Sequence, residues 1–499
     1  MPTVYNIPVE SKRVFFRPER ILLTIQNEIF AQRWFGHKQH LDKGLTIAVN
    51  DTFTLWGSEK EVCYCTIFSL VDSDNKKLSS YYLPLILSTS EPAFPPSKQI
   101  YAILKCTDKD VHLYEAEANK RYLTSILKEM EKGSVLTTEK RAKVNFKRSR
   151  AFKTDGTFRV TPLSQGETTN VVYRVRSDYL DLMFKSYRMI SSHYTEPQTL
   201  KMLAKNGFKN APSVLGHIAL GEESYKSLGL FEDFIKNDGS VFSLFMKWTG
   251  DAMADPSKME DACRDTSERC KRLGAVVRDM HKALKESAED IAQEDVDHYK
   301  AFFQSMREMA QSATANLSEG PLPQMFLELS SKLDGVPAGF DALLGKQKQV
   351  THQDLHLGQV LYNGEDIYVI DFEGEPIRQQ EERAYKLPAI RDVATMLRSF
   401  DYLANMALAP SAQGQLQASL ALGGIQGDAS KDLHAKAQAL KDWKAKACRA
   451  FLEGYGASTD DPLIKVYMVE KALYEIAYEG KFRPELLSIP VTGLQDALR

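Results

Sequence analysis

Our prediction of the fold starts from residues 351–376, which read THQDLHLGQVLYNGEDIYVIDFEGEP. Within it, the apolar runs QVLYN and IYVIDF flank the polar turn GED, which predicts a short β-hairpin. His352 to Gly358 lead into this hairpin, and Asp371 follows it. We therefore expect the hairpin to bring acidic side chains from its two ends together.

Asp354, Gln359 and Asp371 have the spacing of a phosphotransfer site. Such a site needs a carboxylate that accepts the proton of the attacking hydroxyl, and oxygen ligands that hold Mg²⁺ against the nucleotide phosphates. Asp354 is the predicted base of an H-x-D-x-x-x-x-N pattern, in which Gln359 replaces the asparagine and Asp371 opens the segment DFE. Because a glutamine amide still presents a carbonyl oxygen, we expect Gln359 and Asp371 to be metal ligands, with Glu373 sharing that role.

The segment before the hairpin offers a nucleotide-binding lysine and a phosphate-side turn. Lys185 lies in the β-like run YLDLMFK, after the strand–turn–strand pattern LSQGETTNVVYRV, and precedes the acidic hairpin in the order that kinases use. The passage GLFEDFIKND predicts a hinge whose backbone atoms bind adenine. The predicted nucleotide contacts are Lys185, Gly166, Thr168, Asn170, Asp233 and Ile235.

Two other interpretations compete with a kinase. His352, Asp354 and His356 fall on one face if their loop is extended, which is also the pattern of a hydrolase metal site. Alternatively, this is a polar loop whose histidines cap backbone groups. Both leave DFEGEP and Lys185 without a role, so we favour the kinase.

Composition excludes several classes of function. The 499 residues carry 64 Lys and Arg against 66 Asp and Glu, a net charge of −2, so no excess charge predicts binding to nucleic acid or to a membrane. The six cysteines show no repeated CxxC spacing, and Cys63 and Cys65 are expected in a strand core. The start of the sequence lacks the apolar core of a signal peptide, and no run is long enough to span a membrane. We expect a cytoplasmic protein.

The order of patterns predicts an α+β chain with a protein-kinase-like bilobal fold. Short β-rich runs such as EVCYCTIFSLVD and YYLPLILS come first, and nearly everything after residue 265 is helical except the hairpin. We predict an N-terminal β-rich cap at 1–135, a small nucleotide-binding lobe at 136–240, and a helical catalytic lobe at 241–499.

The same segments resemble a known family, the bacterial maltokinases, which are aminoglycoside-phosphotransferase-like enzymes that are sometimes fused to trehalose synthase. HQDLHLGQVL and VIDFEGEP are similar to that family's HGDLHLGQVL and IDFEGEP. RDVATMLRSFDYLA and KALYEIAYEGKFRPELLSIP are close to the helices that follow, and QRWFG resembles a segment of its N-terminal cap.

The resemblance implies a Mg²⁺-dependent sugar kinase that binds ATP between two lobes and phosphorylates maltose at its anomeric hydroxyl, giving maltose 1-phosphate. Carried over by position, Asp354 is the base, Lys185 holds the nucleotide phosphates, and His356 contacts the sugar or positions Asp354. Trehalose synthase is a possible protein partner on the same ground.

Two positions depart from that family. Gln353 stands where the family has glycine. Gln198 stands near the place of the glutamate that should pair with the lysine, and Glu196 lies two residues earlier. Either Glu196 replaces that glutamate or Lys185 is held loosely, which would weaken catalysis.

Sugar recognition needs carboxylates, amides and arginines for the hydroxyls and an aromatic face for the ring. The candidates are Arg391, Asp392, Tyr402, Trp443, Tyr474 and Glu475. Each has a packing alternative, because RDVATMLRSFDYLA shows apolar residues at ordinary helical spacing. The remaining alternatives in function are a kinase for another sugar such as glucosamine, and a catalytically weak sugar-binding or assembly module.

Overall fold

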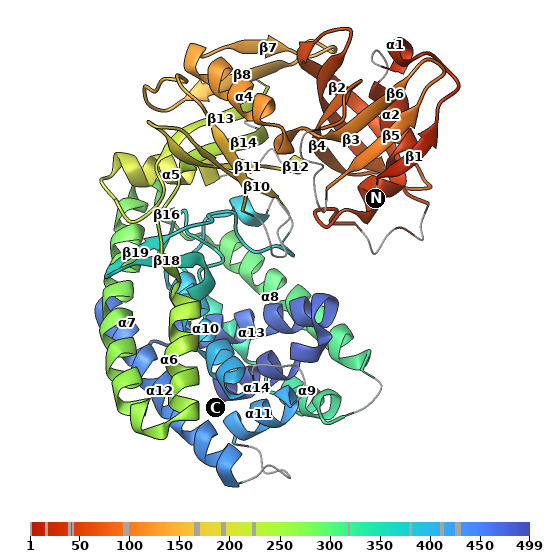
Figure 1. Ribbon diagram of the computed structural model, residues 1–499. Helices are drawn as coiled ribbons and strands as arrows, with labels where there is room; N and C mark the ends of the chain where they lie inside the picture. Colours follow the sequence, from red (N-terminus) through yellow and green to blue (C-terminus); the bar gives the residue numbers. More distant parts are fainter. Residues whose placement is uncertain are drawn as a thin grey trace. The chain divides into compact units, whose positions relative to one another are not determined.

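The computed structural model describes residues 2–14, 18–37, 41, 44–92, 99–163, 170–190, 196–221, 226–317, 320–378, 382–409, 414–424 and 431–499. The chain divides into two compact units (Figure 1). The first comprises residues 1–197, 213–234 and 380–384, and the second comprises 198–212, 235–379 and 385–499. The predicted α+β class is confirmed, with the strands concentrated in the first unit and the helices in the second.

The first unit contains two antiparallel-rich sheets. The first sheet has the strand order β1-β5-β6-β4-β3-β2, and the second has the order β7-β8-β13-β14-β11-β10-β9. The strands of the first sheet are β1 (Thr3–Asn6), β2 (Thr46–Gly57), β3 (Glu61–Val71), β4 (Lys77–Ser88), β5 (Tyr101–Lys105) and β6 (Asp110–Glu115). Those of the second are β7 (Val135–Thr137), β8 (Lys143–Arg148), β9 (Arg159–Pro162), β10 (Val171–Arg176), β11 (Asp181–Ser186), β13 (Val214–Leu220) and β14 (Lys226–Asp233).

One short strand joins the sheets. β12 (Met189–Ile190) follows β11 of the second sheet and pairs with β4 of the first. The predicted cap and small lobe thus have separate sheets but form one compact unit. The helices of this unit are α1 (Ser11–Val14), α2 (Pro18–Thr24), α3 (Gln26–Ala31) and α4 (Lys120–Lys132), and α5 (Glu196–Lys205) begins at its edge.

The apolar run of β3 explains the core of the first unit. Every residue from Val62 to Leu70 is buried, including Cys63 and Cys65, which are free thiols in the core as expected. α4 is amphipathic: the side chain of Asn119 accepts from the backbone N–H of Arg121 at its start, and Gly133 ends it with a left-handed φ of 67°. Local sequence therefore fixes both ends of this helix.

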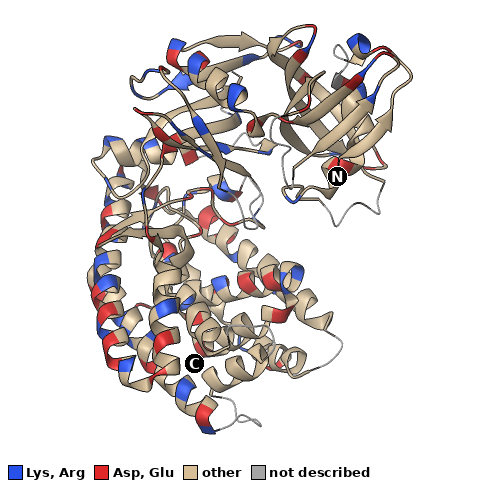
Figure 2. Cartoon of the chain, in the orientation of Figure 1, with Lys and Arg blue, Asp and Glu red and all other residues tan. Residues whose placement is uncertain are grey.

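The second unit is mostly helical and contains a small hairpin. Its helices are α6 (Val241–Ala254), α7 (Met259–Ala283), α8 (Gln293–Ala315), α9 (Leu322–Ser330), α10 (Ile390–Leu408), α11 (Gln415–Leu422), α12 (Lys431–Tyr455), α13 (Pro462–Phe482) and α14 (Ser488–Leu498). α13 packs against α8, α10 and α14 and is buried along most of its length. On α7, Lys and Arg alternate with Asp and Glu (Figure 2), as expected for a solvated helix face.

The predicted hairpin is confirmed as β18 (Val360–Asn363) and β19 (Asp366–Val369). Asn363 pairs with Asp366, so the turn is Gly364-Glu365, and Gly364 has a φ of 57° that glycine adopts without strain. β15 (Gly239–Ser240) adds a third strand beside β18, and β16 (Glu289–Asp290) pairs with β17 (Gln347–Lys348). Residues Leu357–Gln359, which lead into the hairpin, pack against α6 and α10.

Among the described residues, no helix combines the length and the apolar character that crossing a membrane requires.

Candidate active site

The loop before the hairpin is held by a buried carboxylate of α10. Asp392 accepts hydrogen bonds from the backbone N–H groups of His352 (2.8 Å) and Gln353 (2.9 Å), and it lies 3.0 Å from Nε2 of His281. Burial alone would raise the pKa of Asp392, but the His281 hydrogen bond and the charges and N–H groups around it hold that pKa below its ordinary value. Asp392 is therefore a buried anion that fixes the shape of the loop.

Gln353 adopts a backbone conformation that favours glycine. Its φ is 68°, in the left-handed region. Its side chain is buried and donates from Nε2 to the backbone carbonyl of Tyr385 (3.0 Å). The backbone carbonyl of Gln353 accepts from Nη1 of Arg391 (3.0 Å). The departure from glycine at this position is thus accommodated by contacts of the longer side chain.

His352 connects the loop before the hairpin to the segment that follows β19. Its Nδ1 accepts from the backbone N–H of Asp354 (3.3 Å), so Nε2 carries the proton and donates to the carbonyl of Ile370 (2.9 Å). Since backbone groups use both ring nitrogens, His352 has no nitrogen left for a metal. The His352–Asp354–His356 trio of a hydrolase is therefore not supported, and the His356 ring instead accepts from the N–H of Gly358 (3.1 Å).

Asp354 is the part of the loop that presents a carboxylate. Its Oδ1 lies 3.2 Å from Nζ of Lys471, and its Oδ2 lies 4.0 Å from Nε2 of His356, beyond hydrogen-bond distance. The side chain is 16% exposed, so the carboxylate is largely enclosed yet reachable. One oxygen is thus fixed and the other is left for a reacting group.

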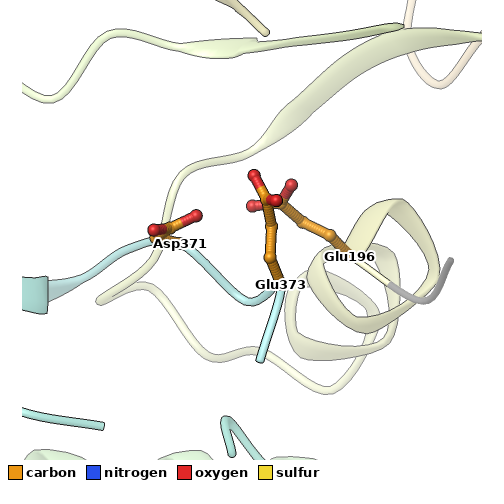
Figure 3. Close-up of side chains that lie close together, drawn as sticks. All are labelled: Glu196, Asp371 and Glu373. Atoms are coloured by element: carbon orange, nitrogen blue, oxygen red, sulfur yellow. The ribbon is translucent and has the colours of Figure 1, made fainter. Parts of the chain in front are cut away.

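Gln359, which directly precedes β18, lies beside Asp371 and Glu373, which follow β19. Nε2 of Gln359 donates to Oδ2 of Asp371 (2.9 Å), so the side-chain carbonyl of Gln359 is turned away from that carboxylate oxygen. Carboxylate oxygens of Asp371 and Glu373 lie within 4.8 Å of each other, and both residues follow β19 (Figure 3). Hard oxygen donors at this separation suit Mg²⁺, so these residues fit the predicted metal.

A balanced cluster of buried charges lies beneath Asp354. Glu375 Oε2 accepts from Nε of Arg378 (2.6 Å) and Nη2 of Arg391 (2.7 Å), and its Oε1 accepts from Lys471 (2.7 Å). Glu470 binds both arginines. Burial alone would raise the pKa of Glu375, but Arg391, Lys471 and Arg378 hold it well below its ordinary value.

Arg391 and Asp392, predicted as sugar contacts, therefore have another role. Their side chains are 1% and 0% exposed and are used by the loop and the charge cluster. Both side chains bind the loop that carries Asp354, because their face of α10 is turned toward it.

The other sugar candidates are buried or partly buried and have partners within the protein. Trp443 is fully buried and its indole N–H donates to Thr266 (3.0 Å), so the ring is a core residue and cannot stack on a sugar. Glu475 is largely buried in an ion pair with Arg398 (2.7 Å). Tyr402, which is partly exposed, donates to Glu479 (2.8 Å).

Tyr474 lies nearer the proposed base. Its ring is 4.3 Å from Nζ of Lys471, and its hydroxyl accepts from the N–H of Ile377 (3.4 Å). Of the six predicted sugar residues, Tyr474 is the one whose ring contacts a residue that binds Asp354.

In the first unit, Lys185 has its acidic partner. It lies on the inner strand β11, paired with Val172 and Leu230 on the two sides. Its Nζ donates to both carboxylate oxygens of Glu196 (2.9 and 3.1 Å), and both side chains are buried. Glu196, labelled in Figure 3 on the first turn of α5, thus supplies the ion pair, whereas Gln198 is exposed.

The remaining nucleotide candidates are only partly tested by the structure. Gly166 and Thr168 lie outside the described residues, and the Asn170 side chain accepts from the N–H of Arg188 (3.4 Å). Asp233 ends β14 with its N–H bonded to the carbonyl of Ser213 (2.9 Å) and its carboxylate bonded to Arg150 (2.8 Å). The chain passes from the first unit to the second between Phe234 and Ile235, where the hinge was predicted.

Sequence reasoning missed Lys471 and Glu375. A signal was present, because Lys471 is the one basic residue in the mostly apolar run VYMVEKALYEIA, which also holds Glu470 and Glu475. A helix that is apolar nearly all round is buried, and a lysine on it needs anionic partners.

Comparisons with known proteins show which family the chain resembles. Residues 159–422, from the start of β9 to the end of α11, match the APH family, described as the phosphotransferase enzyme family. A glucosamine kinase of Streptacidiphilus jiangxiensis is 23% identical over 316 residues, which is 60% of this chain and 65% of that protein, just under two thirds of its length.

Solved structures show the same fold. A glucosamine kinase structure (crystal form B) superposes with a TM-score of 0.61 at 16% identity, over 94% of this chain and 98% of that one. A glucosamine kinase in complex with glucosamine, ADP and inorganic phosphate gives a TM-score of 0.57 at 17% identity, over 91% and 94% of the two chains. Because the family match covers more than half of the residues, the chain belongs to the phosphotransferase enzyme family and has its kinase-like fold.

Proposed function

We propose that this protein transfers the γ-phosphoryl group of ATP to a hydroxyl group of a sugar. The observation that carries the proposal is the state of Asp354: Lys471 holds Oδ1, and Oδ2 is left beside His356 within hydrogen-bonding reach of an incoming hydroxyl. Membership of the phosphotransferase family supports the same reaction class.

The reaction assigns each residue one task. Oδ2 of Asp354 accepts the proton of the sugar hydroxyl while the oxygen of that hydroxyl forms a bond to the γ-phosphorus. At the same time the bond between the γ-phosphorus and the bridging oxygen breaks, and that oxygen leaves with ADP. Lys185, fixed by Glu196, binds the nucleotide phosphates. Asp371, Gln359 and Glu373 would hold Mg²⁺, which neutralises phosphate charge when bound.

Maltose is our first candidate substrate, because HQDLHLGQVL and VIDFEGEP resemble the maltokinase motifs. Glucosamine is the second candidate, because the relative and the structural neighbours are named glucosamine kinases. Phosphorylation of maltose at the anomeric hydroxyl, and an association with trehalose synthase, rest on the maltokinase resemblance.

The test is release of ADP from purified protein with ATP and Mg²⁺, with maltose, glucose, glucosamine, trehalose or no sugar. Asp354→Asn should reduce sugar-dependent release to a slow residual rate, because the amide keeps the side-chain size but cannot act as the base. The matched control is Asp366→Asn at the exposed start of β19 in the same hairpin, which should leave release unchanged.

The outcomes separate the candidates. Release with maltose that is largely lost in Asp354→Asn supports a maltokinase, and release with glucosamine keeps the mechanism while changing the substrate. Sugar-dependent release that persists undiminished in Asp354→Asn contradicts the role of Asp354. Binding of ATP and sugar without release would instead support a binding or assembly module.

A further inference from the structure

Lys471 is a buried cation that binds the proposed base from a distant part of the chain. It belongs to α13, 117 residues after Asp354, and its side chain is 8% exposed. Burial alone would lower the pKa of Lys471, but Glu375 and Asp354 raise that pKa above its ordinary value, so the group is an ammonium ion.

The position of this ammonium is fixed on three sides. Nζ lies 2.7 Å from Oε1 of Glu375 and 3.2 Å from Oδ1 of Asp354, and it stands over the ring of Tyr474 at 4.3 Å from the centroid. Glu375 is itself fully buried and held through its other oxygen by Arg378 and Arg391. Lys471 therefore ties the partly exposed carboxylate of Asp354 to a cluster of buried side chains that hold one another in place.

Charge balance explains why the cluster needs this lysine. Its three anions and three cations are Asp354, Glu375, Glu470, Arg378, Arg391 and Lys471. Without Lys471, Glu375 would keep both arginines, while Asp354 would lose the only lysine or arginine that binds it among the described residues. Removal of the Lys471 charge would thus affect Asp354 more than Glu375.

We propose that Lys471 is a positioning residue for the carboxylate of Asp354. By holding Oδ1, it orients this carboxylate so that Oδ2 faces the sugar hydroxyl. This inference rests on the proposed kinase function. It assigns Lys471 no contact with ATP or sugar, so its loss should lower the rate of transfer while substrate binding is retained.

The experiment is a double-mutant cycle with the sugar that supports ADP release. Lys471→Met keeps the length of the side chain and removes the charge, and Lys465→Met, at an exposed lysine of the same helix, is the matched control. We expect Lys471→Met to lower kcat by roughly 10- to 100-fold, with the KM values for ATP and sugar changed less than about threefold. Lys465→Met should behave as the unmodified protein.

The second half of the cycle tests whether Lys471 acts through Asp354. The slow residual transfer of Asp354→Asn is measured at high protein concentration, and in that background Lys471→Met should cause no further loss of kcat, because the group that it positions has been removed. An equal further loss in that background, or a rise of both KM values without a fall in kcat, would overturn the inference.

A second variant keeps the test valid if Lys471→Met alone does not fold, because it also removes one negative charge from the cluster. Lys471→Met combined with Glu375→Gln restores equal numbers of positive and negative charges in the cluster, and it should fold yet show the same fall in kcat. Full activity of this double variant would contradict a positioning role.

Failure of the inference is distinguishable from failure of the proposed function. If Asp354→Asn reduces transfer to a slow residual rate but Lys471→Met does not lower kcat, the kinase assignment stands and the inference is wrong. If no sugar supports ADP release by the unmodified protein, both are overturned.

Discussion

Glu196 binds Lys185 with both of its carboxylate oxygens, at 2.9 and 3.1 Å from Nζ, and it also accepts a hydrogen bond from the hydroxyl of Tyr187 (2.5 Å). Glu196 is the first residue of α5, and Pro197 follows it in the first helical turn. The ion pair therefore depends on where this helix begins, two residues before the exposed Gln198.

The first prediction concerns this ion pair. Glu196→Gln leaves the ammonium of Lys185 buried with a neutral partner, so we expect the free energy of unfolding to fall by about 3 kcal/mol and the KM for ATP to rise. Chemical denaturation and ATP-dependent kinetics measure the two effects. Gln198→Ala is the control and should change stability by less than about 0.5 kcal/mol. A large effect of Gln198→Ala together with a silent Glu196→Gln would contradict the pairing.

The second prediction concerns the left-handed backbone at Gln353. Gln353→Ala keeps the unfavourable φ and loses the hydrogen bond to Tyr385, whereas Gln353→Gly loses the same bond but relieves the strain. The glycine variant should therefore be about 1 kcal/mol more stable than the alanine variant, opposite to the order in a helix. Urea denaturation of the two proteins checks this, and a more stable alanine variant would rule out the strain.

The third prediction is a pH dependence from Asp392. Its folded-state pKa is lowered, so its anion stabilises the fold above the unfolded-state pKa of about 4, and this contribution is lost as the pH falls through the folded-state pKa. Asp392→Asn should cost about 2 kcal/mol at pH 7 and at pH 5, because a neutral amide replaces the anion that the loop N–H groups bind.

The pH test compares the variant with the unmodified protein in urea at pH 7, 5, 4 and 3. The difference in unfolding free energy should be constant down to pH 5 and shrink below about pH 4. Asp366→Asn, at an exposed position, is the control and should show no such difference. A difference that grows toward low pH would have the wrong sign for a stabilising buried anion.

The fourth prediction concerns the metal ligands. Asp371→Asn removes a negative oxygen donor and the acceptor of the Gln359 amide, so half-maximal activity should require at least about tenfold more Mg²⁺, a loss of about 1.4 kcal/mol in binding. Titration of activity with Mg²⁺ at fixed ATP measures this. An unchanged Mg²⁺ requirement in Asp371→Asn would remove this residue from the ligand set.

Much of the catalytic hairpin follows from local sequence. The two apolar runs and the Gly364 turn specify the pairing of β18 and β19, and the spacing of Asp354, Gln359 and Asp371 along the chain then brings those residues to one end of the hairpin. The order of β-rich and helical patterns predicts the α+β class for the same reason, because periodicity and turn residues act over a few positions.

Local sequence is enough to specify the hairpin and its acids, whereas the side chains around them depend on how distant helices pack. Arg391 and Asp392 were predicted to reach the sugar and instead hold the loop, and Trp443 fills the core, because packing decides which face of each helix is buried. Lys471 reaches Asp354 across 117 residues. No local pattern encodes such a contact, since it exists only when α13 packs beneath the loop and burial makes each charge bind a partner.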